Sequence, residues 1–201
     1  MKNKLILVFI FLSSTLIYAQ KLKIKEGSFK NLKDIKEYSL IFDYSNLEIP
    51  KFDSEEDFLK DKMDKREEKE AGSGEEFKKS WFEDRENRYE PKFIESFNKR
   101  FEDNTVNVNK RENSRYTMVV KTTLMYAGYN VGVWRQNAKI EATITIFETD
   151  NADKILFSGD YTKVEGNGAM GYDFNSGYRI SEAYAKLAKE FAKNLKKKGL
   201  K

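Results

Sequence analysis

The chain has 201 residues, of which 39% are hydrophobic and 35% are charged, and its formal net charge at pH 7 is +4. It contains no cysteine and no histidine. These absences exclude disulfides, thiol nucleophiles, thiolate metal sites, imidazole bases and the usual zinc and copper ligands. Carboxylate, tyrosine, lysine and serine chemistry stays open, as does metal binding through oxygen ligands. We identify no catalytic residue, metal site or cofactor in the sequence.

Residues 1–19 have the three-part pattern of a secretory signal peptide. Lys2 and Lys4 give a positive start, an apolar run extends from Leu5 to Leu12, and Ala19 is a small residue at the cleavage position. The apolar run is shorter than the roughly 20 residues of a membrane span. A bacterial lipid anchor needs a cysteine, which the chain lacks. We therefore expect cleavage near Ala19 and export to the periplasm or the extracellular space, without a membrane span or a lipid anchor.

The positive charge of the chain comes largely from this first segment. Without Lys2 and Lys4 the net charge falls from +4 to +2, because residues 1–19 carry no acid. A nucleic-acid-binding protein usually has a marked basic domain or stripe. The lysines between residues 186 and 201 are better explained as the solvated face and last turn of a helix. We therefore expect no nucleic-acid partner.

The first half of the remaining chain predicts a strand and then helices. Alternating apolar residues predict a strand over 38–45. Ser54 and Asp57 resemble a helix-capping pair, with a short apolar stripe after them. The charged segment 64–76 contains a Gly-Ser-Gly break and predicts a solvated helix end and a mobile loop. An aromatic stripe from Phe77 to Phe101 then predicts a core-facing helix that Pro91 splits near Tyr89.

The second half predicts three consecutive antiparallel strands and a helix. Apolar residues alternate over 118–126 and 140–146, and a third strand covers 155–161. Residues 150–153 predict a tight hairpin, whereas the link 127–138 is either a long loop or the twisted ends of both strands. An amphipathic helix follows over 180–198. We expect residues 20–201 to form a single α+β domain, with an antiparallel sheet of about four strands and helices on one face.

One apparent nucleotide-binding motif and one apparent pair of catalytic acids have simpler explanations. Residues 166–171 match the pattern G-x-G-x-x-G, but no strand follows to complete a nucleotide-binding βαβ unit, so we expect a glycine loop. The adjacent acids Glu55 and Glu56 point about 100° apart on a helix, which is unsuited to a pair of catalytic carboxylates. A solvated surface explains such pairs.

Aromatic residues in two loop segments are the candidate binding site. Aromatic rings in loops stack on sugars or anchor a protein partner, and tryptophan and arginine are typical anchors. The alternative is that these loops fold over the open end of the sheet and bury their rings. The candidate residues are Tyr126, Tyr129, Trp134 and Arg135 in the first segment, and Tyr172, Phe174 and Tyr178 in the glycine-rich segment.

Several short segments resemble an uncharacterised secreted-protein family of Bacteroidetes-type bacteria. These segments are Phe42–Asn46, Ser54–Asp57, Trp81 with Asp84 and Arg85, Pro91–Phe93 and Phe97–Lys99. The C-terminal part, with Gly159, the glycine loop and the helix beginning near Ala183 and Tyr184, is also similar to periplasmic domains of the curli-secretion-channel lipoprotein kind. The second resemblance implies an interaction module associated with the cell envelope. Those relatives are often lipidated, whereas this chain has no cysteine to modify.

These observations favour a non-catalytic binding module of the cell envelope with a protein or glycan partner. Two alternatives stay open. One is a hydrolase, which would need at least two acids converging in a pocket with perturbed ionisation. The other is a small carrier with an apolar cavity lined by Phe93, Phe97, Leu124 and Ile144.

Overall fold

The computed structural model describes residues 21–101, 105–110, 114–131, 134–166 and 175–200. The helices are α1 (Glu55–Glu67), α2 (Ser73–Asp84), α3 (Glu90–Asn98) and α4 (Ser176–Lys198), with a 3-10 turn, η1 (Phe29–Leu32), and a π-helical turn, η2 (Arg85–Tyr89). The strands are β1 (Lys21–Gly27), β2 (Glu37–Asp43), β3 (Asn107–Asn109), β4 (Tyr116–Tyr126), β5 (Tyr129–Val131), β6 (Trp134–Gln136), β7 (Ala138–Glu148) and β8 (Asn151–Gly166). The fold is α+β, as the sequence predicts. No described helix is both long enough and apolar enough to cross a membrane.

The main sheet has six strands in the order β1-β8-β7-β4-β2-β3. The strands β4, β7 and β8 are antiparallel neighbours, which confirms the three consecutive strands of the prediction. The sheet as a whole is mixed, because β2 pairs in parallel with both β4 and β3. The prediction of an antiparallel sheet of about four strands is therefore wrong in strand number and in direction.

The two additional strands have weak sequence signals. In β1 only Leu22 and Ile24 are apolar and every residue except Leu22 is exposed, so the apolar alternation of this edge strand is short. The strand β3 has three residues. Its pairing places Val108 opposite Tyr38, and both side chains are buried.

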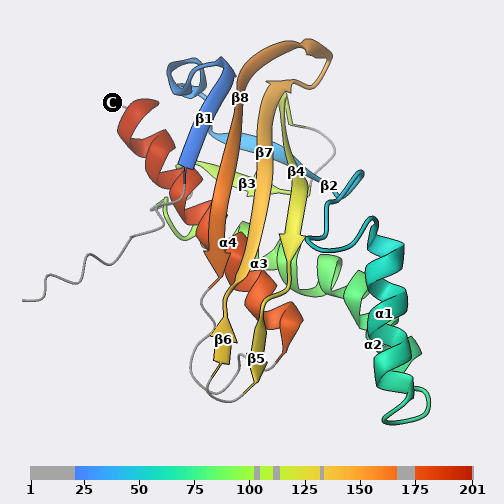
Figure 1. Cartoon of the computed structure of the whole chain (residues 1–201). Coiled ribbons are helices and arrows are strands. Elements are labelled where there is room, and N and C mark those ends of the chain that lie inside the picture. Colours follow the sequence, from blue (N-terminus) through green and yellow to red (C-terminus); the bar gives the residue numbers. More distant parts are fainter. Residues whose placement is uncertain (1–20, 102–104, 111–113, 132–133, 167–174, 201) are drawn as a thin grey trace, which may run out of the picture.

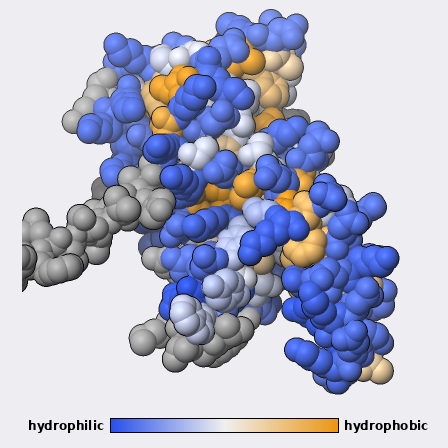
Figure 2. All heavy atoms as spheres, in the orientation of Figure 1, coloured by the Kyte–Doolittle hydropathy of each residue, from blue (hydrophilic) through white to orange (hydrophobic). Residues whose placement is uncertain are grey.

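Helices α3 and α4 cover one face of the sheet (Figure 1). Phe191 of α4 packs on Phe157 of β8 and Phe97 of α3, with ring centroids 5.8 and 5.9 Å apart. On the opposite face, small polar side chains pair across strands. There Thr143 donates a hydrogen bond to Asp160 at 2.7 Å. Figure 2 shows hydrophilic residues over much of the surface in this view, with hydrophobic patches between them.

The predicted interruption of the aromatic helix near Tyr89 is confirmed as the π-helical turn 85–89, which ends two residues before Pro91. Proline has no N–H to donate, and an extra residue in the turn is one way to accommodate that loss. Trp81, before the turn, contacts Phe58 of α1 with centroids 4.7 Å apart. Tyr89, at the end of the turn, stacks on Tyr184 of α4 at 5.3 Å. The aromatic stripe therefore packs against two different elements.

The charged segment 64–76 lies mainly in helices. Residues 64–67 complete α1, residues 73–76 begin α2, and the link is residues 68–72. Gly72 has a φ of 86°, a conformation that favours glycine. The predicted cap is confirmed, because the Ser54 hydroxyl accepts a hydrogen bond from Asp57 N at 3.0 Å. The resulting α1–α2 hairpin projects away from the sheet (Figure 1).

The link 127–138 forms a second, two-stranded sheet of β5 and β6, with Tyr129 paired to Gln136 and Val131 to Trp134. The turn between β7 and β8 is also tighter than predicted, because β7 ends at Glu148 and β8 begins at Asn151. Helix α4 begins four residues earlier than predicted, at Ser176, with Asn175 as its cap. Of the glycine pattern 166–171, only Gly166 lies among the described residues, at the end of β8.

Candidate functional site

A groove of about 390 Å³ lies where the α1–α2 hairpin meets the end of β4, β5 and the first turns of α4. Its lining residues are Ile49, Pro50, Lys51, Phe52, Phe58, Lys62, Arg66, Phe77, Tyr126, Ala127, Gly128, Tyr129, Asn130, Ser176 and Arg179. Five of these residues are aromatic, four are cationic and none is acidic. We call this feature the aromatic groove.

One wall of the aromatic groove comes from the helical hairpin. The Phe52 and Phe58 rings meet edge to face with centroids 5.3 Å apart. The Phe58 and Phe77 rings are 6.2 Å apart in the same type of contact. Phe77 is four residues before Trp81 on α2, so the two rings lie on the same face of the helix. The wall is therefore a connected set of rings from α1, α2 and the segment directly before α1.

The opposite wall is fixed by Arg179, which is 5% exposed. Its Nε and Nη2 donate hydrogen bonds to Ala127 O at 3.1 and 3.0 Å, and Nη2 also donates to Gly128 O at 3.3 Å. Gly128 has a φ of 65°, and a Cβ there would lie 2.4 Å from Gln136 O. A charge-assisted set of bonds and an obligatory glycine therefore hold the backbone between β4 and β5 in place.

Two cations lie on the aromatic rings of the groove. The Lys62 amine is 5.3 Å from the Phe52 ring centroid and 5.6 Å from that of Phe58. The Arg66 guanidinium carbon is 3.9 Å from the Phe77 centroid, which is a close cation–π contact. Burial lowers the pKa of Arg66, although an arginine side chain stays protonated in proteins. The groove is therefore positively charged as well as aromatic.

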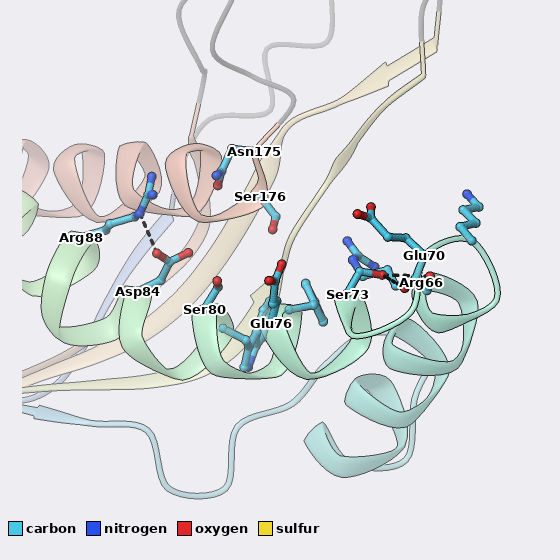
Figure 3. A pocket seen from close by; sticks show the side chains of 12 residues that line it. Arg66, Glu70, Ser73, Glu76, Ser80, Asp84, Arg88, Asn175 and Ser176 are labelled. Atoms are coloured by element: carbon cyan, nitrogen blue, oxygen red, sulfur yellow. Dashed lines mark hydrogen bonds and ion pairs between the residues drawn. The ribbon is translucent and has the colours of Figure 1, made fainter.

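A second cleft of about 500 Å³ adjoins the aromatic groove and shares Arg66, Phe77 and Ser176 with it (Figure 3). Burial raises the pKa of Asp84 in this cleft, and Arg88 Nε pairs with Asp84 Oδ1 at 2.6 Å. The acids Glu70, Glu76 and Asp84 line the cleft, and the last two lie on α2. Eight residues separate them, which is about 12 Å along a helix. Paired carboxylates of glycosidases lie roughly 5–9.5 Å apart, so this acid pair does not match a hydrolase site.

The structure brings two of the seven predicted site residues into the aromatic groove. Tyr126 and Tyr129 line it, and the Tyr126 hydroxyl donates a hydrogen bond to Gln136 Oε1. Trp134 and Arg135 are exposed on β6 and do not line the groove. Tyr178 is half-buried in the first turn of α4. Tyr172 and Phe174 lie outside the described residues.

Tyr129 is 39% exposed and Trp134 is 71% exposed. For these two rings, the alternative in which the loops fold back and bury their aromatics is therefore wrong. Sequence reasoning missed the partners of Tyr126 and Tyr129 across the groove. The sequence analysis placed Phe77 in the core and Arg66 in a solvated helix end and mobile loop. No periodic signal links these helix residues to β5.

A third surface, a groove of about 680 Å³, lies beside α4 and is lined by Arg100, five lysines and Glu190. Glu190 pairs with Lys186 at 3.2 Å and approaches Lys193 at 3.9 Å. These lysines occupy the solvated face of α4, as the sequence predicts.

Comparison with known proteins gives little further information. No protein-family model and no curated protein matches the chain. Among solved structures, a chain of PelC from Paraburkholderia phytofirmans, described as a dodecamer, is 10% identical and aligns with a TM-score of 0.37. The alignment covers 84% of this chain and 97% of that chain. The family resemblances drawn from the sequence stay predictions.

Proposed function

We propose that this protein is an exported, non-catalytic binding module of the bacterial cell envelope, and that the aromatic groove is its binding surface. The observation that carries the proposal is the convergence of five aromatic rings from three separate parts of the chain on one groove without an acidic lining residue. Concave sites lined by aromatic rings with a few fixed polar groups are typical of ligand and partner recognition. The leader-like residues 1–19 and the absence of cysteine support export without a lipid anchor.

The exposed face of the β5–β6 hairpin extends this surface. Trp134 is 71% exposed, and Arg135 follows it on the same short strand. Tryptophan and arginine are enriched among residues that contribute most to protein interfaces. A partner that fills the groove would pass Tyr129 and reach this hairpin. A protein partner therefore fits the surface, and a glycan stacked on the rings is the alternative.

The two rival functions have less support. The hydrolase would use acids of the second cleft, where Glu76 and Asp84 lie too far apart along α2 for a paired-carboxylate mechanism. The apolar carrier would need a cavity beside Phe93, Phe97 and Ile144, but these side chains are 0% exposed and packed in the core. Neither they nor Leu124 lines any of the grooves described above.

The test is capture of a partner from the envelope and medium of the organism that makes the protein. Wild type is compared with Tyr129→Ala in the groove, with the double variant Trp134→Ala, Arg135→Ala on the hairpin, and with Tyr116→Ala as a control. Tyr116 begins β4, whereas Tyr126 ends the same strand, so the control lies at the opposite end of the sheet. We expect the control to retain a partner that the folded groove variant loses. Equal capture by all four proteins would contradict the proposal.

A further inference from the structure

We infer that the aromatic groove binds an organic anion with an aromatic or aliphatic body, and that the Arg66 guanidinium holds the negative charge of that ligand. The inference rests on the proposed function, because it assigns a ligand class to the same groove. Three features of the groove carry it: an arginine without an acidic partner among the described residues, a lining without carboxylates, and aromatic rings in the same lining.

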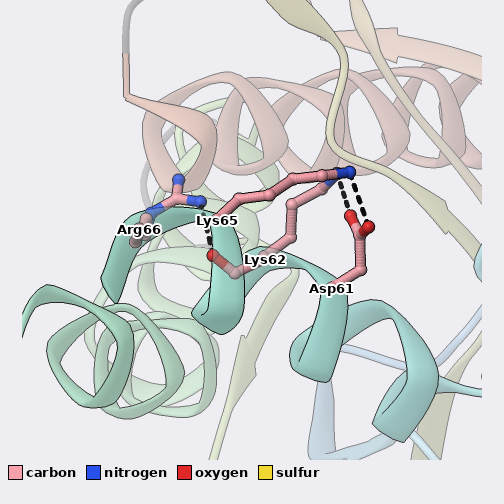
Figure 4. A network of polar contacts seen from close by, with 4 residues as sticks. All are labelled: Asp61, Lys62, Lys65 and Arg66. Atoms are coloured by element: carbon pink, nitrogen blue, oxygen red, sulfur yellow. Dashed lines mark hydrogen bonds and ion pairs between the residues drawn. The ribbon is translucent and has the colours of Figure 1, made fainter. Parts of the chain in front are cut away.

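Arg66 has no carboxylate partner among the described residues. Its polar contact there is a hydrogen bond from Nη1 to Lys62 O at 3.3 Å. Asp61 of the same helix pairs with Lys62 at 2.9 Å and with Lys65 at 2.6 Å, and Glu70 lines the adjoining cleft together with Arg66. Figure 4 shows both lysines directed to Asp61, while the Arg66 side chain extends the other way. A guanidinium has five N–H donors, so most of them are available to a ligand.

The position of Arg66 suits an anion that is also apolar. The guanidinium is stacked on Phe77 and half-buried, so it is held in place and partly shielded from water. A charge beside low-dielectric walls interacts more strongly with a counter-charge than it would in bulk water. Arginine binds carboxylate, sulfonate and phosphate groups through two parallel hydrogen bonds. Because no acid lines the groove, nothing in its lining repels such a group.

The rings define the other half of the ligand. Phe77 lies under Arg66, and the exposed ring of Tyr129 lines the same groove. A planar body can stack on these rings while its charge reaches Arg66 and Lys62. The volume of about 390 Å³ falls in the range of small-ligand sites. A neutral sugar would satisfy the rings and leave the Arg66 guanidinium without an anionic partner.

The test uses two fluorescent probes that differ in one group. The anion 8-anilinonaphthalene-1-sulfonate and the neutral N-phenyl-1-naphthylamine share an aromatic body, and only the first carries a sulfonate. Each probe is titrated into the purified full chain and its variants. Arg66→Met removes the charge and keeps an apolar side chain over Phe77. Arg115→Met is the matched control, because Arg115 precedes β4 at the other end of the sheet and its side chain is 74% exposed.

We expect the sulfonate probe to bind wild type about tenfold more tightly than the neutral probe. An affinity ratio of about this size corresponds to the contribution of one charge-assisted hydrogen bond. Arg66→Met should remove that advantage and leave the affinity for the neutral probe within about twofold of wild type. Arg115→Met should leave the affinities for both probes within about twofold of wild type. Arg66→Lys keeps the charge without the planar stack and should lose part of the advantage. Circular dichroism and thermal melting establish that each variant is folded.

The outcomes separate this inference from the proposed function. Equal binding of both probes, with both lost in Tyr129→Ala, would leave the groove as the binding surface and overturn the role of Arg66. Failure of both probes to bind, or their undiminished binding to Tyr129→Ala, would overturn the groove itself.

Competition against the sulfonate probe then distinguishes two sources of the same chemistry. Displacement by the peptide acetyl-Asp-Trp-Asp-amide, and not by acetyl-Asn-Trp-Asn-amide, would assign the ligand to an acidic, aromatic segment of a protein partner. Displacement by indole-3-acetate alone, and not by indole-3-acetamide, would assign it to a free aromatic acid. If neither anion displaces the probe, the inference is wrong.

Discussion

The carboxylate of Asp84 lies against the backbone of Gly177, so that a Cβ at position 177 would be 1.8 Å from Asp84 Oδ2. Oδ1 of the same carboxylate pairs with Arg88 at 2.6 Å. This contact joins the end of α2 to the first turn of α4. It also puts a negative charge near the positive end of the α4 dipole, where an anion is stabilised.

Gly177→Ala should therefore destabilise the protein even though alanine is the better helix former. The new methyl group forces the Asp84 side chain or the start of α4 to move, and we expect a loss of about 1–2 kcal/mol in the free energy of unfolding. Urea unfolding measures it. The control is the same substitution made in an Asp84→Ala background, where the clash is gone and the change should be neutral or stabilising. Equal effects in both backgrounds would show that the Asp84 contact is not the cause.

The two tryptophans should report opposite environments. Trp81 is 3% exposed and Trp134 is 71% exposed. We expect Trp134→Phe to shift the fluorescence emission to shorter wavelength and to remove most of the quenching by acrylamide. The free energy of unfolding should change by less than about 0.5 kcal/mol, because an exposed side chain loses little on substitution. Persistent quenching would mean that Trp81 is accessible.

Glu55 should be more important to stability than its neighbour Glu56. The Glu55 carboxylate accepts a hydrogen bond from Trp81 Nε1 at 2.6 Å and pairs with Arg85, so it connects α1 to α2 and η2. Glu55→Ala leaves both donors without that partner, and we expect a cost of about 2 kcal/mol in unfolding free energy. Glu56→Ala is the matched control, since both acids lie in the first turn of α1 and Glu56 is exposed. A cost within about 0.5 kcal/mol is expected there.

Five tyrosines with buried hydroxyl groups should make the protein unstable in alkali. Burial raises the pKa of Tyr38, Tyr44, Tyr89, Tyr161 and Tyr184 above the ordinary value of 10.0. The unfolded chain loses these protons near pH 10 and the folded chain retains them. Their contribution to stability is therefore full below about pH 10 and is lost as the pH rises toward the folded pKa values.

The free energy of unfolding and the tyrosinate absorbance between pH 8 and pH 12 measure this effect. We expect stability to fall above about pH 10 and ionisation of the five phenols to coincide with unfolding. In Tyr184→Phe the decline should be shallower, because one titrating group is gone. This variant also loses the 2.6 Å hydrogen bond with Thr122, at a cost of about 1 kcal/mol at neutral pH. A wild-type stability that stays constant to pH 12 would contradict the prediction.

Local patterns predicted the elements well where a single strong signal existed. The Ser54 cap and the break before Pro91 are set by local backbone chemistry, and the structure has both. The direction of β2 could not be predicted in this way, because apolar alternation is the same in parallel and antiparallel strands. The charged segment 64–76 is also ambiguous, since a solvated helix end and a loop have similar composition. Its turn residue, Gly72, was correctly within the predicted break.

The candidate site could be predicted only on one side. Tyr126 and Tyr129 lie where one predicted strand ends and the link to the next begins. Aromatic residues at such positions favour a binding role. Phe77 and Arg66 join them through tertiary packing of the α1–α2 hairpin, which no local spacing encodes. Trp134 and Arg135 are close in sequence to the groove residue Tyr129, but they lie on the exposed strand β6.

The place of β2 in the sheet has a consequence for the order of folding. Its two neighbours, β3 and β4, are both synthesised after it, and Leu40 pairs with Met118 across a long stretch of chain. Closing so long a loop costs more conformational entropy than forming a hairpin, and contacts of this range form slowly. The antiparallel meander of β4, β7 and β8 needs no such closure. We therefore expect the meander to form first and β2 to dock on its edge as a late step, which completes the sheet.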